Sequence, residues 1–522
     1  MKRIFSILLC LTLLTGLFSG CTAAHDPEAY TPTGDALEQE NGAEESEQTE
    51  EAAQTMSLAY YSDRSLNPLK ATDYTNRVIT SLIYQGLFAV NRDYEVLPIL
   101  CKSYSVTADL LTYEFTVDPR ATFSDGAAVT PEDVEASLKA AKKSTYYSGR
   151  MRLFKSINAT EEGTVRIKLS QAVENLPLLL DIPIVKADQT GEDNPLGTGP
   201  YILGGTEDYR FLSRRSNWWC QSSDLLITAQ RIPLISADSP ATIRDAFEFS
   251  DAGVVCTDPG SDRYVEYRCD YELWDCETGI FLYLGVNKES SVFKKQSARQ
   301  ALSKGIDRDY LVDHYYRGFA TAAELPAAPN SPYYTPALAQ QYAYDAMEFQ
   351  AGMSSVKSKS IRLLVNQADS LRVKVAQEIG RMLNTSGLIV EVVSMTPEKY
   401  ETALEEGNFD LYLGQTKLSP NMDLSQFFSA NGTLNVGGLA DIGMYTLCLQ
   451  ALENQGNYYT LHQTVMDEGY LCPILFRSYA VYAARGLMTQ LKPARDSLFC
   501  YSIGRTLTDA YTATDDYTDQ EE

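Results

Sequence analysis

Residues 361–413 alternate between apolar segments of strand length and segments with helical spacing, and this pattern restricts the fold more than any other feature of the chain. In order, the five segments are 361–365, 371–383, 388–393, 397–404 and 409–413. Short apolar runs are typical of buried strands, whereas apolar residues at every third or fourth position are typical of helices. Alternating strands and helices pack as layers around a sheet. The sequence therefore predicts an α/β fold.

The segment Thr122–Val134 predicts a turn followed by a capped helix. Asp125 and Gly126 are turn residues, because Asp can accept a hydrogen bond from its own backbone and Gly tolerates positive φ. Thr130 is expected at the N-cap, followed by a proline at the first helical position. Asp133 lies three residues after the cap and completes a capping box.

The composition permits a large core and argues against nucleic-acid binding. With 522 residues, of which 44% are apolar, the chain can form about three domains of roughly 150 residues each. Its formal net charge of −25 would repel phosphates. Much of this charge lies in residues 22–55 and 508–522, which contain no Lys or Arg. We therefore expect an acidic disordered tether over 21–55 and an acidic disordered tail over 508–522.

The first 21 residues are typical of a bacterial lipoprotein signal. Lys2 and Arg3 precede the apolar segment Ile4–Leu17, which is short for a membrane span. The following LFSGC resembles a lipobox, which predicts a signal peptide over 1–20 and lipidation of Cys21. A secretory signal that is cut elsewhere is the alternative. Acyl chains on Cys21 would anchor the protein to the membrane.

The sequence offers little material for catalysis. It contains three His and no GxSxG, HExxH or Walker loop, so we expect no enzymatic activity, no metal site and no cofactor. Eight cysteines follow Cys21 in the chain, and none forms a CxxC pair. A disulfide between Cys269 and Cys276 and free buried thiols are both compatible with the sequence.

Several short motifs occur in a fixed order along the chain. They are Tyr84-Gln85-Gly86-Leu87, Phe123-Ser124-Asp125-Gly126 with Thr130–Val134, Gly197–Tyr201, and Ile306-Asp307-Arg308. As an ordered set they resemble the bacterial extracellular solute-binding protein family 5, the peptide- and nickel-binding proteins of ABC importers. The resemblance covers nearly all of Met56–Leu507.

The resemblance implies a two-lobed periplasmic-binding-protein-like fold (type II, cluster C) with an extra subdomain on the first lobe. The first lobe is expected to be discontinuous, because the chain crosses between the lobes twice. The expected boundaries are 56–275 for lobe I, with the inserted subdomain at about 73–197, then 276–477 for lobe II and 478–507 for the return to lobe I.

The same resemblance implies a lipid-anchored, extracytoplasmic and monomeric binding protein. It would capture an oligopeptide or a similar small solute between the lobes and deliver it to ABC permease and ATPase subunits. A lipoprotein that senses a peptide without a role in transport is the alternative.

The expected ligand contacts lie on both lobes. Peptide-binding members of the family hold the ligand's amino terminus with an Asp in a loop that follows a Gly-Trp pair. Here Gln415 stands at the Trp position and Leu418 at the Asp position, so this anchor is not carried over. Asp423 either replaces it or caps a helix at Leu424. The full expected set is Asp73, Tyr74, Tyr283, Asn366, Gln415 and Asp423.

Overall fold

The structure is a computed structural model that describes residues 56–260, 267–356, 359–384, 387–495, 497–505 and 511–513. The chain divides into two units, 1–53 and 54–522, and all described residues belong to the second. The expected signal peptide, Cys21 and the tether lie outside the described residues, as does most of the tail. Every helix described is too short or too polar to span a bilayer.

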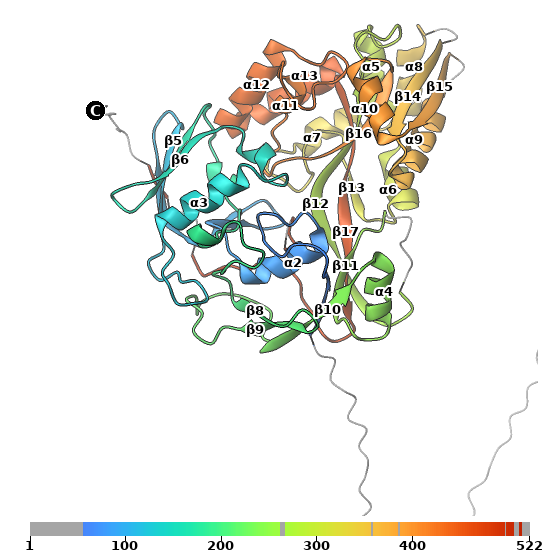
Figure 1. The fold of residues 1–522 in the computed structure, drawn as a ribbon. Helices are drawn as coiled ribbons and strands as arrows, with labels where there is room; N and C mark the ends of the chain where they lie inside the picture. The colour runs from blue at the N-terminus through green and yellow to red at the C-terminus, as the bar shows by residue number, and fades with distance from the viewer. Residues whose placement is uncertain are drawn as a thin grey trace, which may run out of the picture. The chain divides into compact units, whose positions relative to one another are not determined.

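A large mixed sheet forms the centre of the described unit (Figure 1). Its main path is β15-β14-β16-β12-β17-β11-β1-β10-β9-β8, and β13 pairs with β17 off this path. The strands are β1 Leu58–Tyr61, β8 Tyr201–Gly205, β9 Arg210–Arg214, β10 Arg231–Ala237, β11 Val254–Thr257, β12 Tyr271–Val286, β13 Ala320–Ala322, β14 Lys359–Asn366, β15 Leu388–Met395, β16 Leu411–Lys417 and β17 Leu471–Ala484.

The long antiparallel strands β12 and β17 join the two halves of this sheet. The start of β12 pairs with the end of β17, which in turn pairs with β11. The other end of β12 pairs with β16. We call β12 and β17 the crossing strands, β1 with β8–β11 the first half, and β14–β16 the second half. The register between the crossing strands shifts between Glu277 and Ile280, where Gly279 has a φ of +70°.

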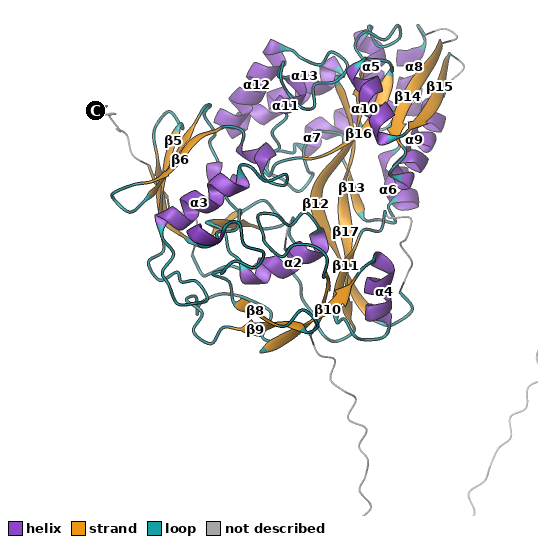
Figure 2. Ribbon diagram, in the orientation of Figure 1, coloured by secondary structure: helices purple, strands orange, loops and turns teal. Residues whose placement is uncertain are grey.

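The second half contains the predicted alternation of strands and helices. β14 pairs in parallel with both β15 and β16. Helices α9 (Ser370–Leu383) and α10 (Pro397–Glu405) connect these strands and pack against β14 and β15. Figure 2 shows helices beside this part of the sheet. The two helices begin within a residue of their expected starts, so this part of the sequence analysis is confirmed.

Further helices cover the second half and the loops between the strands. Their bounds are α5 Gln296–Lys304, α6 Arg308–Tyr315, α7 Pro336–Ala339, α8 Ala346–Met353, α11 Ser425–Phe428, α12 Ile442–Glu453 and α13 Tyr458–Glu468. Side chains from α5, α6, α8 and α9 share one buried apolar cluster with the second half of the sheet. The helices α11–α13 contribute instead to the largest cluster, which also fills the first half and its insertion.

The insertion between β1 and β8 carries four strands of a second sheet, in the order β4-β5-β7-β6, and β18 from the C-terminal part of the chain pairs in parallel with β4. These strands are β4 Cys101–Val106, β5 Thr112–Val117, β6 Phe154–Ala159, β7 Val165–Leu169 and β18 Tyr511–Ala513, and a small hairpin joins β2 Phe88–Val90 to β3 Val96–Pro98. Helix α3 (Pro131–Ala141) packs on β6 and β7. Its capping box between Thr130 and Asp133 forms as predicted.

Two helices of the first half begin near the carboxyl ends of its parallel strands. Helix α2 (Tyr74–Ile83) has Asp73 as its N-cap, and α4 (Pro240–Glu248) has Ser239. The parallel neighbours of β1 are β10 and β11. A ligand site in an open α/β sheet is expected at such an edge, outside the carboxyl ends of the strands.

Candidate ligand-binding site

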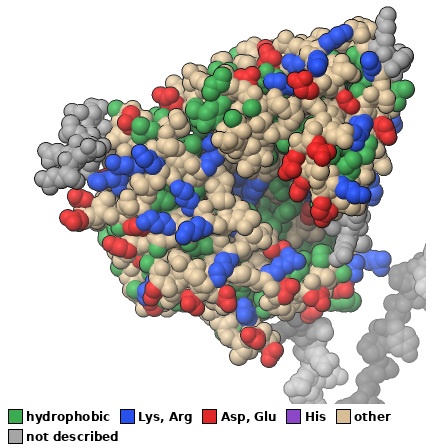
Figure 3. Space-filling model, turned by 45° about the horizontal axis from the view of Figure 1, so that its top comes forward, with side chains coloured by type: hydrophobic (Ala, Val, Ile, Leu, Met, Phe, Trp, Pro, Cys, Tyr) green, Lys and Arg blue, Asp and Glu red, His purple; other side chains and the backbone are tan. Residues whose placement is uncertain are grey.

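One face of the described unit has a hollow with hydrophobic and basic side chains inside it (Figure 3). The cavity that we consider lies at the carboxyl ends of β1 and β11 and has a volume of about 310 Å³. Its walls include Tyr61, Asp73, Tyr74, Arg244, Asp258 and Tyr479. We call it the Asp258 cavity. Its mixture of carboxylates, one guanidinium and phenol rings is suited to a small polar ligand.

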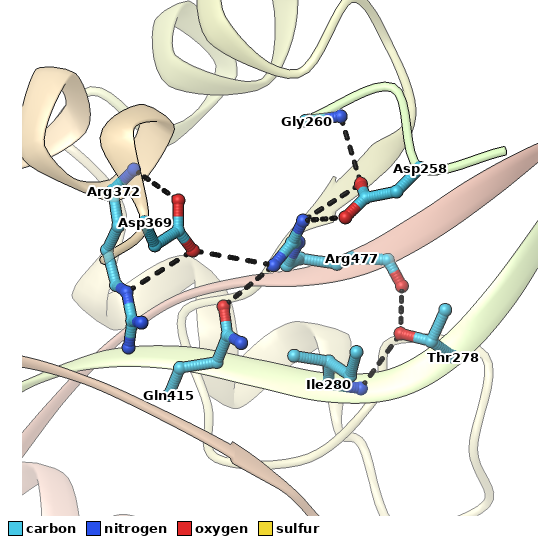
Figure 4. Close-up of polar contacts among 8 residues, drawn as sticks. All are labelled: Asp258, Gly260, Thr278, Ile280, Asp369, Arg372, Gln415 and Arg477. Carbon is cyan, nitrogen blue, oxygen red and sulfur yellow. Dashed lines mark hydrogen bonds and ion pairs between the residues drawn. The ribbon is translucent and has the colours of Figure 1, made fainter. Parts of the chain in front are cut away.

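A buried arginine on crossing strand β17 lies next to this cavity (Figure 4). The Arg477 side chain is 7% exposed. Its Nη2 donates to both carboxylate oxygens of Asp258, at 2.9 and 2.8 Å. Its Nη1 donates to Oε1 of Gln415 at 2.9 Å and lies 3.9 Å from the Asp369 carboxylate. We call these four residues the Arg477 cluster.

The Arg477 cluster connects the two halves of the large sheet. Asp258 directly follows β11 in the first half. Asp369 is the N-cap of α9, and Gln415 lies on β16, so both belong to the second half. Burial acts to lower the pKa of Arg477, but Asp258, Tyr316 and Asp369 act in the opposite direction and the pKa is raised. The guanidinium is therefore held as a buried cation between groups from both halves.

Backbone and neighbouring groups fix the orientation of this cluster. Thr278 on β12 donates to the carbonyl of Arg477 at 2.7 Å and accepts from the N–H of Ile280. The N–H of Gly260 donates to Asp258, and the N–H of Arg372 donates to Asp369, each at 2.9 Å. The charged groups thus keep their positions through hydrogen bonds as well as through the ion pairs.

Three of the residues expected from the sequence lie in this region. Asp73 and Tyr74 line the Asp258 cavity. The Tyr74 hydroxyl lies 2.8 Å from the sulfur of Cys276, and its ring meets that of Tyr479 edge-on with centroids 4.8 Å apart. Gln415 accepts a hydrogen bond from Arg477, which also donates to the cavity residue Asp258 (Figure 4). The structure therefore places two of these expected residues in the cavity wall and the third on the Arg477 cluster next to it.

The other three expected residues have different surroundings. Tyr283 is buried, with its ring edge-on to Phe427. Asn366 ends β14 and accepts a hydrogen bond from the N–H of Ala368 at 2.9 Å. The Asp423 carboxylate pairs with Arg152 and accepts from the N–H of Ser425, the first residue of α11. The N-cap position of α11 is Leu424, which makes no side-chain capping hydrogen bond, so Asp423 contacts the start of this helix from the position before the cap.

The sequence patterns do not single out Arg477, Asp258 or Asp369. One signal was available, since Arg477 interrupts an otherwise apolar strand, and a charged residue at such a position needs a buried partner. Its partner Asp258 is 219 positions away in the sequence. Nothing local in the sequence indicates which carboxylate that partner is.

The cysteines and the remaining polar groups give no sign of a reactive centre. Within the described part of the chain, the eight cysteines from Cys101 to Cys500 form no disulfide with one another, and this includes Cys269 and Cys276. Burial raises the pKa of Cys256, which lines the cavity. Burial also raises the pKa of Cys472, to about 11. Such thiols are poor nucleophiles. Among the described residues, no group of His, Cys, Asp and Glu side chains is arranged to hold a metal ion.

Comparison with known protein families shows the family of this chain. The profile of the bacterial extracellular solute-binding proteins, family 5 (middle part), matches residues 95–436. The chain belongs to this family. Curated relatives match about half of the chain. It is 28% identical over 281 residues to the glutathione-binding protein GsiB of Pectobacterium atrosepticum, and this match covers 51% of this chain and 54% of that protein. For GsiB of Salmonella typhi the identity is 26% over 283 residues, with coverage of 52% and 55%. The chain thus spans about half the length of the curated relatives it matches.

Solved structures of family 5 proteins share the fold. The substrate-binding protein CtaP of Listeria monocytogenes has a TM-score of 0.70 and 18% identity, and the match covers 88% of this chain and 99% of CtaP. HbpA2 of Haemophilus parasuis gives a TM-score of 0.71 and 16% identity, covering 85% and 98%. The oligopeptide-binding protein AppA of Bacillus subtilis, solved with a nonapeptide, gives 0.58 and 17%, covering 85% and 97%. The predicted two-lobed, type II binding-protein fold is confirmed.

Proposed function

We propose that this protein captures an oligopeptide or a similar small solute between two hinged lobes and delivers it to an ABC permease and its ATPase. The family supports a role in solute binding outside the cytoplasm. Relatives named for binding glutathione and a neighbour solved with a nonapeptide support a peptide-like cargo. A role as a binding protein, and not as an enzyme, agrees with the buried Cys256 in the cavity wall, because burial raises the pKa of its thiol and makes it a poor nucleophile.

The observation that carries this proposal is the position of Arg477. Its side chain contacts Asp258 in the first half of the sheet and Gln415 in the second, next to the Asp258 cavity. A hinge rotation of one lobe against the other would change these contacts. A ligand that enters here is therefore coupled to the relative position of the lobes.

The proposed lobes follow the boundaries given above, with lobe I over 56–275 and 478–507 and lobe II over 276–477. The proposed anchor is a lipid on Cys21. Such an anchor would hold a monomeric protein at the membrane that contains its permease.

Binding is tested by equilibrium dialysis with a randomised tetrapeptide pool, followed by mass spectrometry of the retained peptides. The Arg477→Gln variant should bind the retained peptides at least about tenfold more weakly, because it loses the buried charge that orders the cluster. Gln415→Ala keeps the Asp258 pair and should have a smaller effect.

The matched control is Glu289→Gln, since this carboxylate is 80% exposed and should not affect binding. Wild-type protein that is folded, freed of co-purified ligand and retains no peptide would contradict a peptide cargo. Mass spectrometry of co-purified molecules then reveals whether another small solute is bound.

A further inference from the structure

Crossing strand β12 has a bulge where it passes from the first half of the large sheet to the second. Its pairing with β17 shifts register between Glu277 and Ile280, and Gly279 within the bulge has a φ of +70°. Before the bulge, β12 lies beside the part of β17 that pairs with β11, and after the bulge it pairs with β16. Because a bulge bends its strand, a rotation of one half against the other can be absorbed here.

The guanidinium of Arg495 lies against the backbone of Gly279. A Cβ at Gly279 would lie 2.5 Å from Cζ of Arg495, which is closer than two carbon atoms can approach. Arg495 belongs to the segment that follows β17, and it is 3% exposed. The guanidinium therefore occupies the space that any side chain at position 279 would need.

Arg495 connects the bulge to a loop of the second half. Its Nη2 donates to the carbonyl of Leu418 at 2.7 Å, and the N–H of Leu418 donates to the carbonyl of Gly279 at 3.1 Å. Its Nη1 donates to the Tyr94 hydroxyl at 3.4 Å, and this hydroxyl donates to the carboxylate of Glu277 at 2.6 Å. The first residue after β16 is thus held both by the bulge and by Arg495.

These contacts fix one end of the loop between β16 and α11, residues 418–424. The other end of this loop is tied to the insertion of the first half, where Asp423 pairs with Arg152. In the proposed division of the chain, Arg495 lies in the segment that returns to lobe I, whereas Leu418 lies in lobe II. A rotation that separates the lobes therefore pulls on the bond between Arg495 and Leu418.

The same bulge also contacts the Arg477 cluster (Figure 4). Thr278 donates to the carbonyl of Arg477, and Arg477 is the partner of Ile280 across the two crossing strands. The Arg477 cluster adjoins the Asp258 cavity through Asp258 itself. A change in the bulge is thus transmitted to the candidate binding site as well as to the loop.

We propose that the Gly279 bulge is the point about which the two lobes bend, and that Arg495 is a positioning residue that limits their separation in ligand-free protein. Arg495 acts through Gly279 and Leu418 and needs no contact with the ligand. The inference rests on the proposed function, because it concerns the two lobes of the proposed binding protein. Arg495 then controls the fraction of molecules that are ready to bind, and this fraction scales the apparent affinity.

The first test is Gly279→Ala, which places a methyl group where the guanidinium of Arg495 lies. The guanidinium should leave the carbonyl of Leu418, so small-angle X-ray scattering of ligand-free protein should give a larger radius of gyration than for wild type. The Kd for the peptides that wild type retains from the randomised tetrapeptide pool should rise at least about tenfold, because fewer molecules are in the binding-competent arrangement.

Gly318→Ala is the matched control, since Gly318 has a φ of +80°. Among the described residues, no atom beyond its chain neighbours lies within 4 Å of a Cβ at this position. The control therefore introduces the same kind of backbone strain as Gly279→Ala but displaces no side chain. It should keep the wild-type radius of gyration and change Kd by less than about twofold, because the binding-competent fraction stays the same.

Arg495→Met tests the guanidinium directly, because Met keeps an unbranched apolar side chain and removes the hydrogen-bond donors. It should increase the radius of gyration of ligand-free protein, as Gly279→Ala does. When the two changes are combined, the increase should be no larger than in Arg495→Met alone, since the group that the new methyl displaces is already gone.

Urea unfolding shows whether each variant is folded, and Gly279→Ala with its control decides the question if Arg495→Met does not fold. A radius of gyration that is unchanged in Gly279→Ala, or that rises equally in Gly318→Ala, would overturn this inference. Additive increases in the double variant would also overturn it, because the bulge and Arg495 would then act independently. The scattering measurement needs no ligand, so wild-type protein that retains no peptide would contradict the proposed cargo and leave this test valid.

Discussion

The carboxylate of Asp423 forms an ion pair with the guanidinium of Arg152, which is 271 positions away in the sequence. Arg152 also donates to the hydroxyl of Ser425. The two charged side chains are 21% and 11% exposed. This contact joins the insertion that carries the five-stranded sheet to the loop between β16 and α11. It gives Asp423 a structural role that is independent of any ligand.

Asp423→Asn should lower the free energy of unfolding by about 2 kcal/mol, because it leaves Arg152 partly buried without its counter-charge. The amide oxygen can still accept from the N–H of Ser425. Urea unfolding measures the effect, and Arg152→Gln in the same background should restore part of the loss through coupling. The control Glu289→Gln, in an exposed pair, should change stability by less than about 0.5 kcal/mol. A similar loss of unfolding free energy in Asp423→Asn and in the control Glu289→Gln would argue against a specific role for the Asp423–Arg152 pair.

The capping box of α3 gives a second prediction. The Thr130 hydroxyl accepts from the N–H of Asp133 at 3.3 Å, and the Asp133 carboxylate accepts from the N–H of Thr130 at 2.9 Å. Thr130→Ala should therefore lower the unfolding free energy by about 1 kcal/mol. Thr402→Ala, within the exposed face of α10, is the matched control and should be neutral or slightly stabilising. Equal effects at both positions would contradict the capping role.

A buried histidine predicts a dependence of stability on pH. Among the described residues, neither ring nitrogen of His462 has a hydrogen-bond partner, and burial lowers its pKa from 6.5 to about 3. Between these values the unfolded chain binds more protons than the folded one, so stability should fall as pH falls through this window. The contribution amounts to several kcal/mol when the window is crossed completely.

His462→Leu should remove this contribution, so that its unfolding free energy falls less steeply than that of wild type below pH 6.5. Urea titrations at several pH values give the comparison. The exposed His314 provides the control, and His314→Gln should follow the wild-type curve. Parallel curves for wild type and His462→Leu would show that the ring is protonated in the fold or that it is solvated.

The lipobox predicts that Cys21 carries the membrane anchor. Cys21→Ser removes the sulfur to which the lipid attaches, so the protein should move from the detergent phase to the aqueous phase in a phase-separation assay. The control is Cys269→Ser, which changes a half-buried cysteine and should leave the partition of the protein between the two phases unchanged. Wild-type protein without lipid by intact-mass measurement would mean that the signal is cut elsewhere.

Local signals in the sequence predicted the helices best. Helices α9 and α10 and the capping box at Thr130 are all present in the structure. Each of them depends on residues that lie within a few positions of one another in the sequence. The apolar spacing of residues 75–87 predicts a helix throughout, but α2 ends at Ile83, where the chain turns into an extended segment. A side chain at Gly86 would lie 2.9 Å from the carbonyl oxygens of Ile182 and Phe88, so tertiary packing determines this end.

The parts of the structure that the sequence does not predict depend on pairing between segments that are far apart in the chain. The apolar run 281–286 predicts a strand for the last part of β12 only, because residues such as Glu272 and Asp275 interrupt the apolar pattern in its first part. That part is a strand because it pairs with β17. The Arg477 cluster likewise joins residues from β11, β16, β17 and α9. Single-sequence patterns do not encode which of these distant groups meet.

Closure of the two lobes over a ligand is tested most directly by small-angle X-ray scattering. The sample is the ligand-free protein, measured alone and with the tetrapeptide that the protein retains most strongly, at about 100 times its Kd. At that excess the ligand should also add about 2.7 kcal/mol to the unfolding free energy, which verifies that the site is occupied. We expect the radius of gyration to decrease when the ligand binds. An unchanged radius of gyration, with the stability increase present, would contradict capture of the ligand by hinge closure.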